Sequence, residues 1–233
     1  MNRRPSDAGP LMDATAGRAT VARNDVVMAF PGVGWRGLQH AKKLLGESPT
    51  RITYADGDLS LMSPGVTHES YVDALRDLVK AVTRAFRIPT RSLGSTLWER
   101  READSGKMPD AAFYVGSVAR IGDRMPDAET DPVPDLVVEV EITNPVNLAL
   151  RAYANMGVPE VWHFARRPRR AAALRFLRLE EGRWVAVAAS PALPMLESAS
   201  VLPLVERAAL MNDLDRADLF DAWIRDELRA PRA

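Results

Sequence analysis

The stretch PDLVVEVEITN, residues 134–144, predicts the central strand of the protein. Apolar and β-branched side chains fill it, which is typical of a strand buried on both faces. Glu139 and Glu141 interrupt this apolar run. Burying a carboxylate costs free energy unless a partner or a metal compensates it. The stretch therefore indicates a functional site as well as a core strand.

Residues two apart on a strand point to the same face, so Glu139 and Glu141 lie together. Two carboxylates repel unless one is protonated or a cation lies between them. Mg²⁺ or Mn²⁺ prefers oxygen ligands and would relieve the repulsion directly. The alternative is that both acids only mark the solvent face of the strand.

A third carboxylate is expected from one of two candidates, Asp110 and Asp135, each of which follows a proline. Asp135 lies four residues before Glu139, or roughly 13 Å at about 3.3 Å per residue, which is too far to share one ion. Asp110 begins the preceding strand and can face Glu139 if the two strands pair. The geometry favours Asp110, Glu139 and Glu141, and it leaves Asp135 to cap or enter the strand.

Periodicity and turn signals predict the elements around this strand. The predicted helices are 34–46, a long one with Thr67 as N-cap, 144–157 with Gly157 as its stop, and 214–228. The predicted strands are 50–55, 58–62, 90–98, 109–119, 135–143, 158–167 and a pair turning at Glu181-Gly182, whereas 99–108 and 120–134 read as loops. The predicted fold class is α/β in the broad sense (α+β), a mixed sheet flanked by helices. We expect a disordered tail at 1–24 and one domain at 25–233.

The composition limits the function. The chain has 31 basic and 31 acidic residues among 233, and this neutrality argues against a dedicated nucleic-acid binder, although a local basic groove would suffice. The absence of cysteine excludes disulfides, zinc–thiolate sites and thiol nucleophiles. No apolar run approaches the roughly 18–20 residues of a membrane span, and no signal peptide is recognisable, so we expect a cytoplasmic protein without a membrane partner.

Two further segments allow a functional and a plain structural interpretation. His68 and Glu69 begin the long helix, where an acid suits the helix dipole in a solvated turn but could also face a metal. The segment HFARRPRR, with Arg175 and Arg178 after it, predicts a basic patch. Such a patch contacts phosphates nonspecifically or is simply a solvated turn.

The order of these segments resembles the Uma-two family, which is grouped with restriction endonucleases in the PD-(D/E)xK nuclease superfamily. The likeness rests on YADGDLSLMSP followed by HES, on LGSTLWERRE with KMPDAAFYV, on DPVPDLVVEVEIT with AYANMGVPEVWHF, and on the closing LPLVERAALMNDLDRADLFDAWIRDEL. It covers about residues 27–228. The combination is specific, whereas each piece alone is a weak signal.

The resemblance implies a restriction-endonuclease-like core and an endonuclease that hydrolyses DNA phosphodiester bonds with metal-activated water. Asp110 occupies the aspartate of the PD motif, and Glu139 occupies the acid of the (D/E)xK motif. Glu141 stands where the motif lysine would be, and Glu69 matches an acid often present on the first helix. The implied cofactor is Mg²⁺ or Mn²⁺, the implied partner is DNA, and a homodimer is compatible with the resemblance.

The chain departs from the family at the cation. Similar sequences carry Lys or Arg eight residues before the glycine of GVPE, where this chain has Ala149. Arg151 is turned about 200° around the helix from that position, so it should point elsewhere. Lys107, just before the PD pair, is another source. The alternative is a degenerate nuclease-fold module that binds or assembles without catalysis; a hydrolase of small phosphate esters is a third hypothesis.

Overall fold

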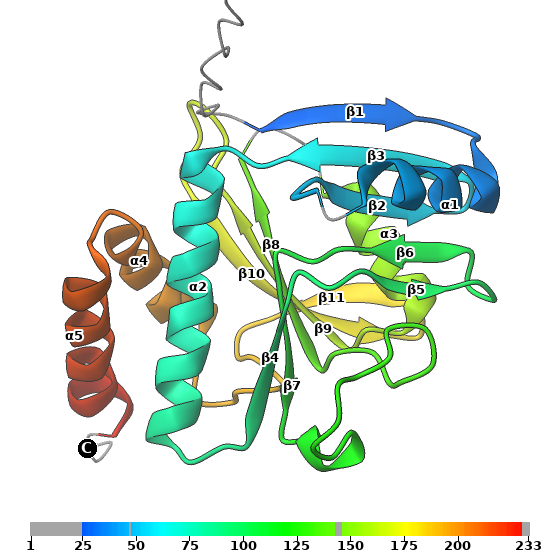
Figure 1. Ribbon diagram of the computed structural model, residues 1–233. Helices are drawn as coiled ribbons and strands as arrows, with labels where there is room; N and C mark the ends of the chain where they lie inside the picture. The colour runs from blue at the N-terminus through cyan, green and yellow to red at the C-terminus, as the bar shows by residue number, and fades with distance from the viewer. Residues whose placement is uncertain (1–24, 47, 143–145, 230–233) are drawn as a thin grey trace, which may run out of the picture.

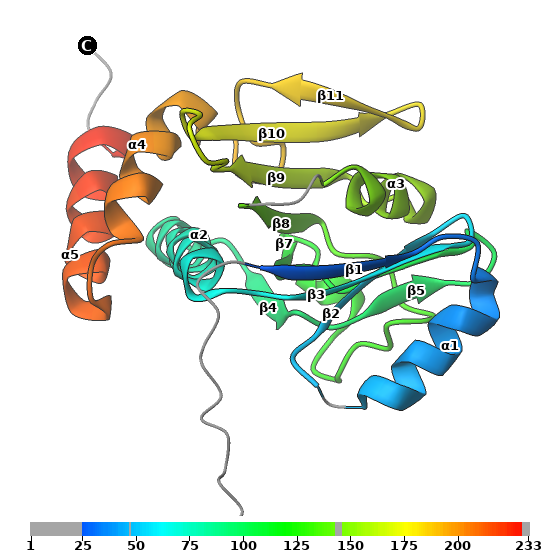
Figure 2. The same cartoon turned by 90° about the horizontal axis from the view of Figure 1, so that it is seen from above.

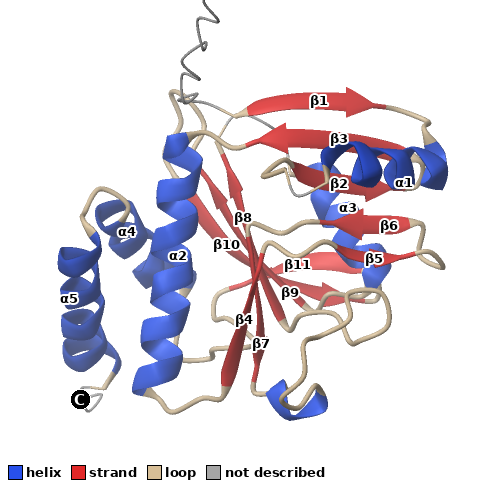
Figure 3. Cartoon of the chain, in the orientation of Figure 1, coloured by secondary structure: helices blue, strands red, loops and turns tan. Residues whose placement is uncertain are grey.

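Two β-sheets and five α-helices make up the computed structural model, which describes residues 25–46, 48–142 and 146–229 (Figures 1 and 3). The tail expected at 1–24 lies outside the described residues. The larger sheet has the order β11-β10-β9-β8-β7-β4. Its strands are β4 (Thr90–Gly94), β7 (Ala111–Val115), β8 (Leu136–Glu141), β9 (Glu160–Ala165), β10 (Ala173–Glu180) and β11 (Arg183–Val187).

Strand β8 is the buried central strand that the sequence predicts. All six of its residues are buried. It pairs antiparallel with β7 and parallel with β9, so the sheet is mixed, as expected. The register joins Ala111 to Val138, and continuing it by one residue places Asp110 opposite Glu139. The predicted pairing of the two acid-bearing strands is therefore confirmed.

Helices α2 (Val66–Ala85) and α4 (Ser198–Ala208) cover one face of this sheet, and α5 (Asp213–Trp223) packs against the outer side of α2 (Figure 2). The apolar stripe of α2 is buried as predicted and forms the main core with the sheet and with α4 and α5. The predicted cap at Thr67 is wrong, because Gly65 is the N-cap residue and Thr67 lies inside the helix. Asp25 accepts a hydrogen bond from the Gly65 N–H at 3.0 Å and fixes the earlier start.

The smaller sheet is a departure from the single sheet predicted. Its order is β1-β3-β2-β6-β5, and its strands are β1 (Val26–Phe30), β2 (Arg51–Ala55), β3 (Asp58–Ser63), β5 (Trp98–Arg100) and β6 (Ser105–Lys107). Helix α1 (Gly34–Leu45) packs on it, and α3 (Asn147–Met156) lies between the two sheets (Figure 2).

The segment 99–108, predicted as a loop, supplies most of β5 and β6. Its strands carry buried charged residues, because Glu99 pairs with Lys42 and Lys107 pairs with Glu139. Because these strands are short and polar, the pattern of hydrophobic residues in the sequence does not indicate them. Helix α4 was also not predicted. The hairpin at Glu181-Gly182 and the end of α3 at Gly157, which has left-handed backbone, are confirmed.

No helix in the described ranges combines the length and the apolar character that crossing a membrane requires.

Candidate active site

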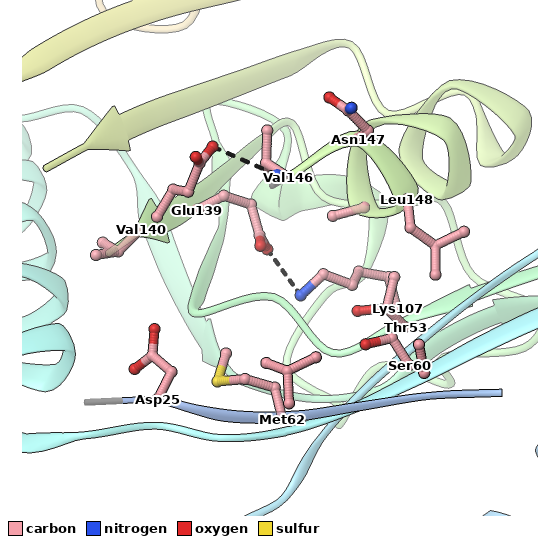
Figure 4. Close-up of a pocket in the computed structure, with 14 residues that line it drawn as sticks. Asp25, Thr53, Ser60, Met62, Lys107, Glu139, Val140, Val146, Asn147 and Leu148 are labelled. Atoms are coloured by element: carbon pink, nitrogen blue, oxygen red, sulfur yellow. Dashed lines mark hydrogen bonds and ion pairs between the residues drawn. The ribbon is translucent and has the colours of Figure 1, made fainter. Parts of the chain in front are cut away.

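A cavity of about 400 Å³ opens between the smaller sheet, the end of β8 and the first turn of α3. Figure 4 shows residues of the smaller sheet on one side of it and residues of α3 on the other. Glu139, Glu141 and Lys107 line it together with Asp25, Val27, Ala29, Thr53, Ser60, Met62, Val140, Val146, Asn147, Leu148 and Ala149. Both acids of the central strand therefore face the same cavity, as their spacing predicts.

Glu139 is held by two buried partners from different elements. The Nζ atom of Lys107, on β6, lies 3.1 Å from Glu139 Oε1, and the hydroxyl of Tyr153, on α3, donates to the same oxygen at 2.5 Å (Figure 4 for Lys107). The exposed fractions of Glu139 and Lys107 are 5% and 2%. Burial raises the pKa of Glu139, and the charge of Lys107 acts in the opposite direction. Lys107 thus stabilises the carboxylate that burial disfavours.

Asp110 lies beside Glu139 at the start of β7 and is completely buried. The backbone N–H of Val140 donates to Asp110 Oδ2 at 2.8 Å and so ties the aspartate to the central strand. The other oxygen, Oδ1, faces His68 Nε2 at 3.1 Å and Arg51 Nε at 3.6 Å. No hydrogen bond of correct geometry reaches Oδ1 from the described residues.

Charge keeps Asp110 ionised in spite of its burial. Burial alone would raise the pKa of Asp110, but the neighbouring His68, Lys107 and the Val140 N–H lower it to about 2. Burial likewise would lower the pKa of His68, but the carboxylates of Asp110 and Asp25 raise it to about 10. Asp110 is therefore an anion at neutral pH, whereas the pKa of Glu139 lies above its ordinary value.

Glu69 and Asp25 are each linked to Asp110 through one intervening side chain. Glu69 accepts a hydrogen bond from Arg51 at 3.2 Å, and its side chain is 39% exposed. Asp25 Oδ2 lies 3.4 Å from His68 Nδ1, so the imidazole is placed between two carboxylates. Glu69 reaches Asp110 only through Arg51. The helix-borne acid that the sequence singled out thus stands beside the site but contacts neither Asp110 nor Glu139.

Glu141 shares the cavity with Glu139 but has its own cations. His163 Nε2 lies 3.0 Å from Glu141 Oε2, and the guanidinium of Arg167 is bonded to Oε1. Burial lowers the pKa of His163, and the charge of Glu141 opposes this effect. Within residues 25–46, 48–142 and 146–229, no group of three or more His, Asp or Glu side chains is arranged to hold a metal.

Asp135 has the separate structural role that the sequence analysis gave it. Its Oδ2 accepts a hydrogen bond from the Val115 N–H at 2.7 Å and another from the Ser117 hydroxyl. These bonds connect the entrance of β8 to the end of β7. The Asp135 carboxylate is therefore engaged by Val115 and Ser117, and it does not line the cavity.

Lys107 lines the cavity together with Ala149, whereas Arg151 does not line it. Ala149 lines the cavity and leaves room there. Arg151 points away, as predicted, and pairs with Asp56 and Asp58 of the β2–β3 turn at 3.1 Å each. Lys107 reaches the same cavity from the smaller sheet. Tyr153, Arg51 and Asp25 are the site residues that sequence reasoning missed, and only the position of Tyr153 in the segment AYANMG gave any signal.

The basic segment after β9 lies at the rim of this site. Arg167 contacts Glu141, a lining residue, and Arg166 pairs with Glu206 at 3.1 Å. Arg169, Arg170 and Arg175 are exposed. The predicted basic patch is thus partly neutralised and partly free to face solvent.

Comparison with known proteins points to nucleases. The model of the Uma2 family, described as "Putative restriction endonuclease", matches residues 38–211, well over half of the chain. A crystal structure of a "putative nuclease belonging to DUF820" from Anabaena variabilis is similar, with 14% sequence identity, a TM-score of 0.39, and coverage of 53% of this chain and 75% of that chain. No curated protein matches.

Proposed function

Because the chain belongs to the Uma2 family, we propose that it is a divalent-metal-dependent nuclease that hydrolyses phosphodiester bonds in DNA. The observation that carries the proposal is that Glu139 and Lys107 line one cavity, with Asp110 beside Glu139 where β7 pairs with β8. Two carboxylates and one ammonium group are the residue types that phosphoryl-transfer chemistry needs, because the reaction develops negative charge on phosphate oxygens.

The carboxylates fit a magnesium or manganese ion. Mg²⁺ is usually held by one or two carboxylates and keeps several waters, so Asp110 and Glu139 suffice as a core. The buried Asp110 Oδ1 forms ion pairs with His68 and Arg51 but no hydrogen bond of correct geometry in the described structure, so it keeps the capacity to accept a further ligand. Glu141 is the third ligand we propose; it would have to exchange His163 and Arg167 for the ion. When bound, the ion would lower the pKa of a coordinated water and supply the nucleophile.

The protein's own residues prepare this chemistry. The Val140 N–H and His68 fix Asp110, and the Tyr153 hydroxyl fixes Glu139. Lys107 lies where an ammonium group can contact a phosphate oxygen and stabilise the charge of the transition state. Glu69 supports the arrangement by holding Arg51 next to Asp110.

The position of Lys107 also argues against the alternative function, a nuclease-fold module that binds or assembles without catalysis. That alternative rested on Ala149, where similar sequences have a cation, and on the neutral net charge. A buried lysine at the same cavity supplies a positive charge from another strand.

Cleavage of DNA tests the proposal. Purified protein is incubated with supercoiled plasmid and with single-stranded DNA in Mg²⁺, in Mn²⁺ and in EDTA, and Asp110→Ala is assayed alongside. We expect nicking or cutting that needs the metal and disappears in Asp110→Ala. Equal cutting by both proteins would identify a contaminating nuclease, and no cutting in any condition would refute the function.

A further inference from the structure

The proposed catalytic groups lie inside the protein. Asp110, Lys107 and Glu139 have exposed fractions of 0%, 2% and 5%. Glu139 and Lys107 both line the cavity of about 400 Å³. A phosphate that reacts there must therefore enter the cavity.

The size of the cavity restricts what can enter. A volume of about 400 Å³ equals that of a cube roughly 7 Å on a side. The major groove of B-DNA alone is about 12 Å wide, so a duplex with both of its backbones is too large to enter. One nucleotide is the unit of nucleic acid that fits.

The walls suit a base more than a sugar–phosphate chain. On the side of the smaller sheet, Val27, Ala29 and Met62 form an apolar surface. Leu148 of α3 faces them across the cavity, as Figure 4 shows for Leu148 and Met62. Aliphatic surfaces on two sides can enclose the flat faces of a base. Three polar side chains, Thr53, Ser60 and Asn147, lie among the same lining residues and can hydrogen-bond to base edges.

We infer that this nuclease acts on an unpaired nucleotide, whose base inserts between the smaller sheet and α3 while its phosphate reaches Lys107 and Glu139. The inference rests on the proposed function and adds its substrate class: single-stranded DNA and unpaired junctions. A base can enter the cavity only from a single strand or after its nucleotide has been extruded from the duplex, which costs a few kcal/mol for unpairing. Arg167, at the rim beside Glu141, supplies a cation along the path of the strand.

The first test compares three DNA substrates of one sequence: a single strand, the fully paired duplex, and a duplex with a gap of a few nucleotides. We expect the single strand and the gap to be cut roughly tenfold or more faster than the duplex, since unpairing costs free energy. Equal rates on the paired duplex would overturn the inference and leave the nuclease function intact. No cutting of any substrate would refute the proposed function instead.

The second test reads binding without cleavage. A single-stranded oligonucleotide with one 2-aminopurine is titrated with the protein in EDTA. Insertion of the base between aliphatic walls should unstack it from its neighbours and raise its fluorescence. Unchanged fluorescence at saturating protein would overturn the inference even if cleavage occurs.

Tryptophan substitutions at two neighbouring residues of β1 provide a test variant and a control variant for both experiments. Val27 and Met28 are neighbours on β1, but Val27 lines the cavity whereas Met28 is 52% exposed on the other side. Val27→Trp should fill the cavity and abolish the fluorescence change, and Met28→Trp should preserve it. Leu148→Trp fills the cavity from the opposite wall, in case Val27→Trp does not fold. Equal behaviour of all folded variants would overturn the inference.

Discussion

The ammonium group of Lys107 lies 3.1 Å from a carboxylate oxygen of Glu139, although the two residues belong to different sheets. This ion pair joins β6 of the smaller sheet to the central strand of the larger one. It is buried, so neither charge is stabilised by bulk water. The candidate active site is therefore also a place where the two sheets are held together.

The first prediction concerns the stability of this pair. Lys107→Met leaves Glu139 buried without its cation, and breaking a buried pair costs about 3–5 kcal/mol of unfolding free energy. Adding Glu139→Gln removes the uncompensated charge and should recover much of that loss. Urea unfolding of the two single variants and the double variant measures the coupling. Additive effects of the two substitutions would show that the pair contributes nothing to stability.

The second prediction distinguishes the roles of Asp110 and Asp135. Asp110→Asn should lower cleavage by at least about 100-fold, because it removes a ligand charge at the site. Asp135→Asn should lower stability but leave the metal-dependent cleavage of the folded protein near that of the wild type, because Asp135 only accepts bonds from Val115 and Ser117. Cleavage rates and circular dichroism of both variants provide the comparison. A reversed order of activities would contradict the assignment.

The third prediction concerns a double variant in which α3, and not β6, carries the ammonium group at the cavity. Ala149 and Lys107 line the same cavity, so a lysine at 149 can reach the same region. The double variant Lys107→Met/Ala149→Lys should therefore regain part of the cleavage lost in Lys107→Met. Ala149→Lys alone should be no more active than the wild type, because a second ammonium group repels the first. Failure of the double variant to exceed Lys107→Met would mean that the two positions are not equivalent.

The fourth prediction follows from the pKa of His68, which rises from 6.5 to about 10 on folding. A group whose pKa is raised by folding stabilises the protein fully below its unfolded pKa and loses this effect as the pH rises through its folded pKa. Asp25, Asp110 and Arg51 are the charged groups around the site of this titration. In EDTA, the unfolding free energy should fall between pH 6.5 and 10, and the fall should be smaller in His68→Gln. Parallel curves for both proteins would exclude His68 as the cause.

Several features of the site could be predicted from particular residues. The alternation of Glu139 and Glu141 in an apolar strand placed both acids on one face, and the Pro-Asp entry to the preceding strand placed Asp110 opposite Glu139. These features are local or depend on one strand pairing. They could be predicted because successive side chains of a β-strand point to opposite faces, with a fixed period of two residues.

The smaller sheet and its cation could not be predicted in the same way. Strands β5 and β6 have three residues each, too few to show a period. Their charged residues are buried by ion pairs with distant parts of the chain, and no local pattern records such partners. Lys107 could be named as a cation near the PD pair, but its position depends on how the two sheets pack.

The proposed role of Lys107 as the cation of the catalytic site can be measured by single-turnover cleavage of single-stranded DNA by Lys107→Met. Lys43→Met, which removes the same charge from an exposed position on α1, is the matched control. Circular dichroism checks that both variants fold. We expect a rate roughly 100-fold or more below the wild type for Lys107→Met and an unchanged rate for Lys43→Met. A folded Lys107→Met variant that cleaves as fast as the wild type would contradict this role of Lys107.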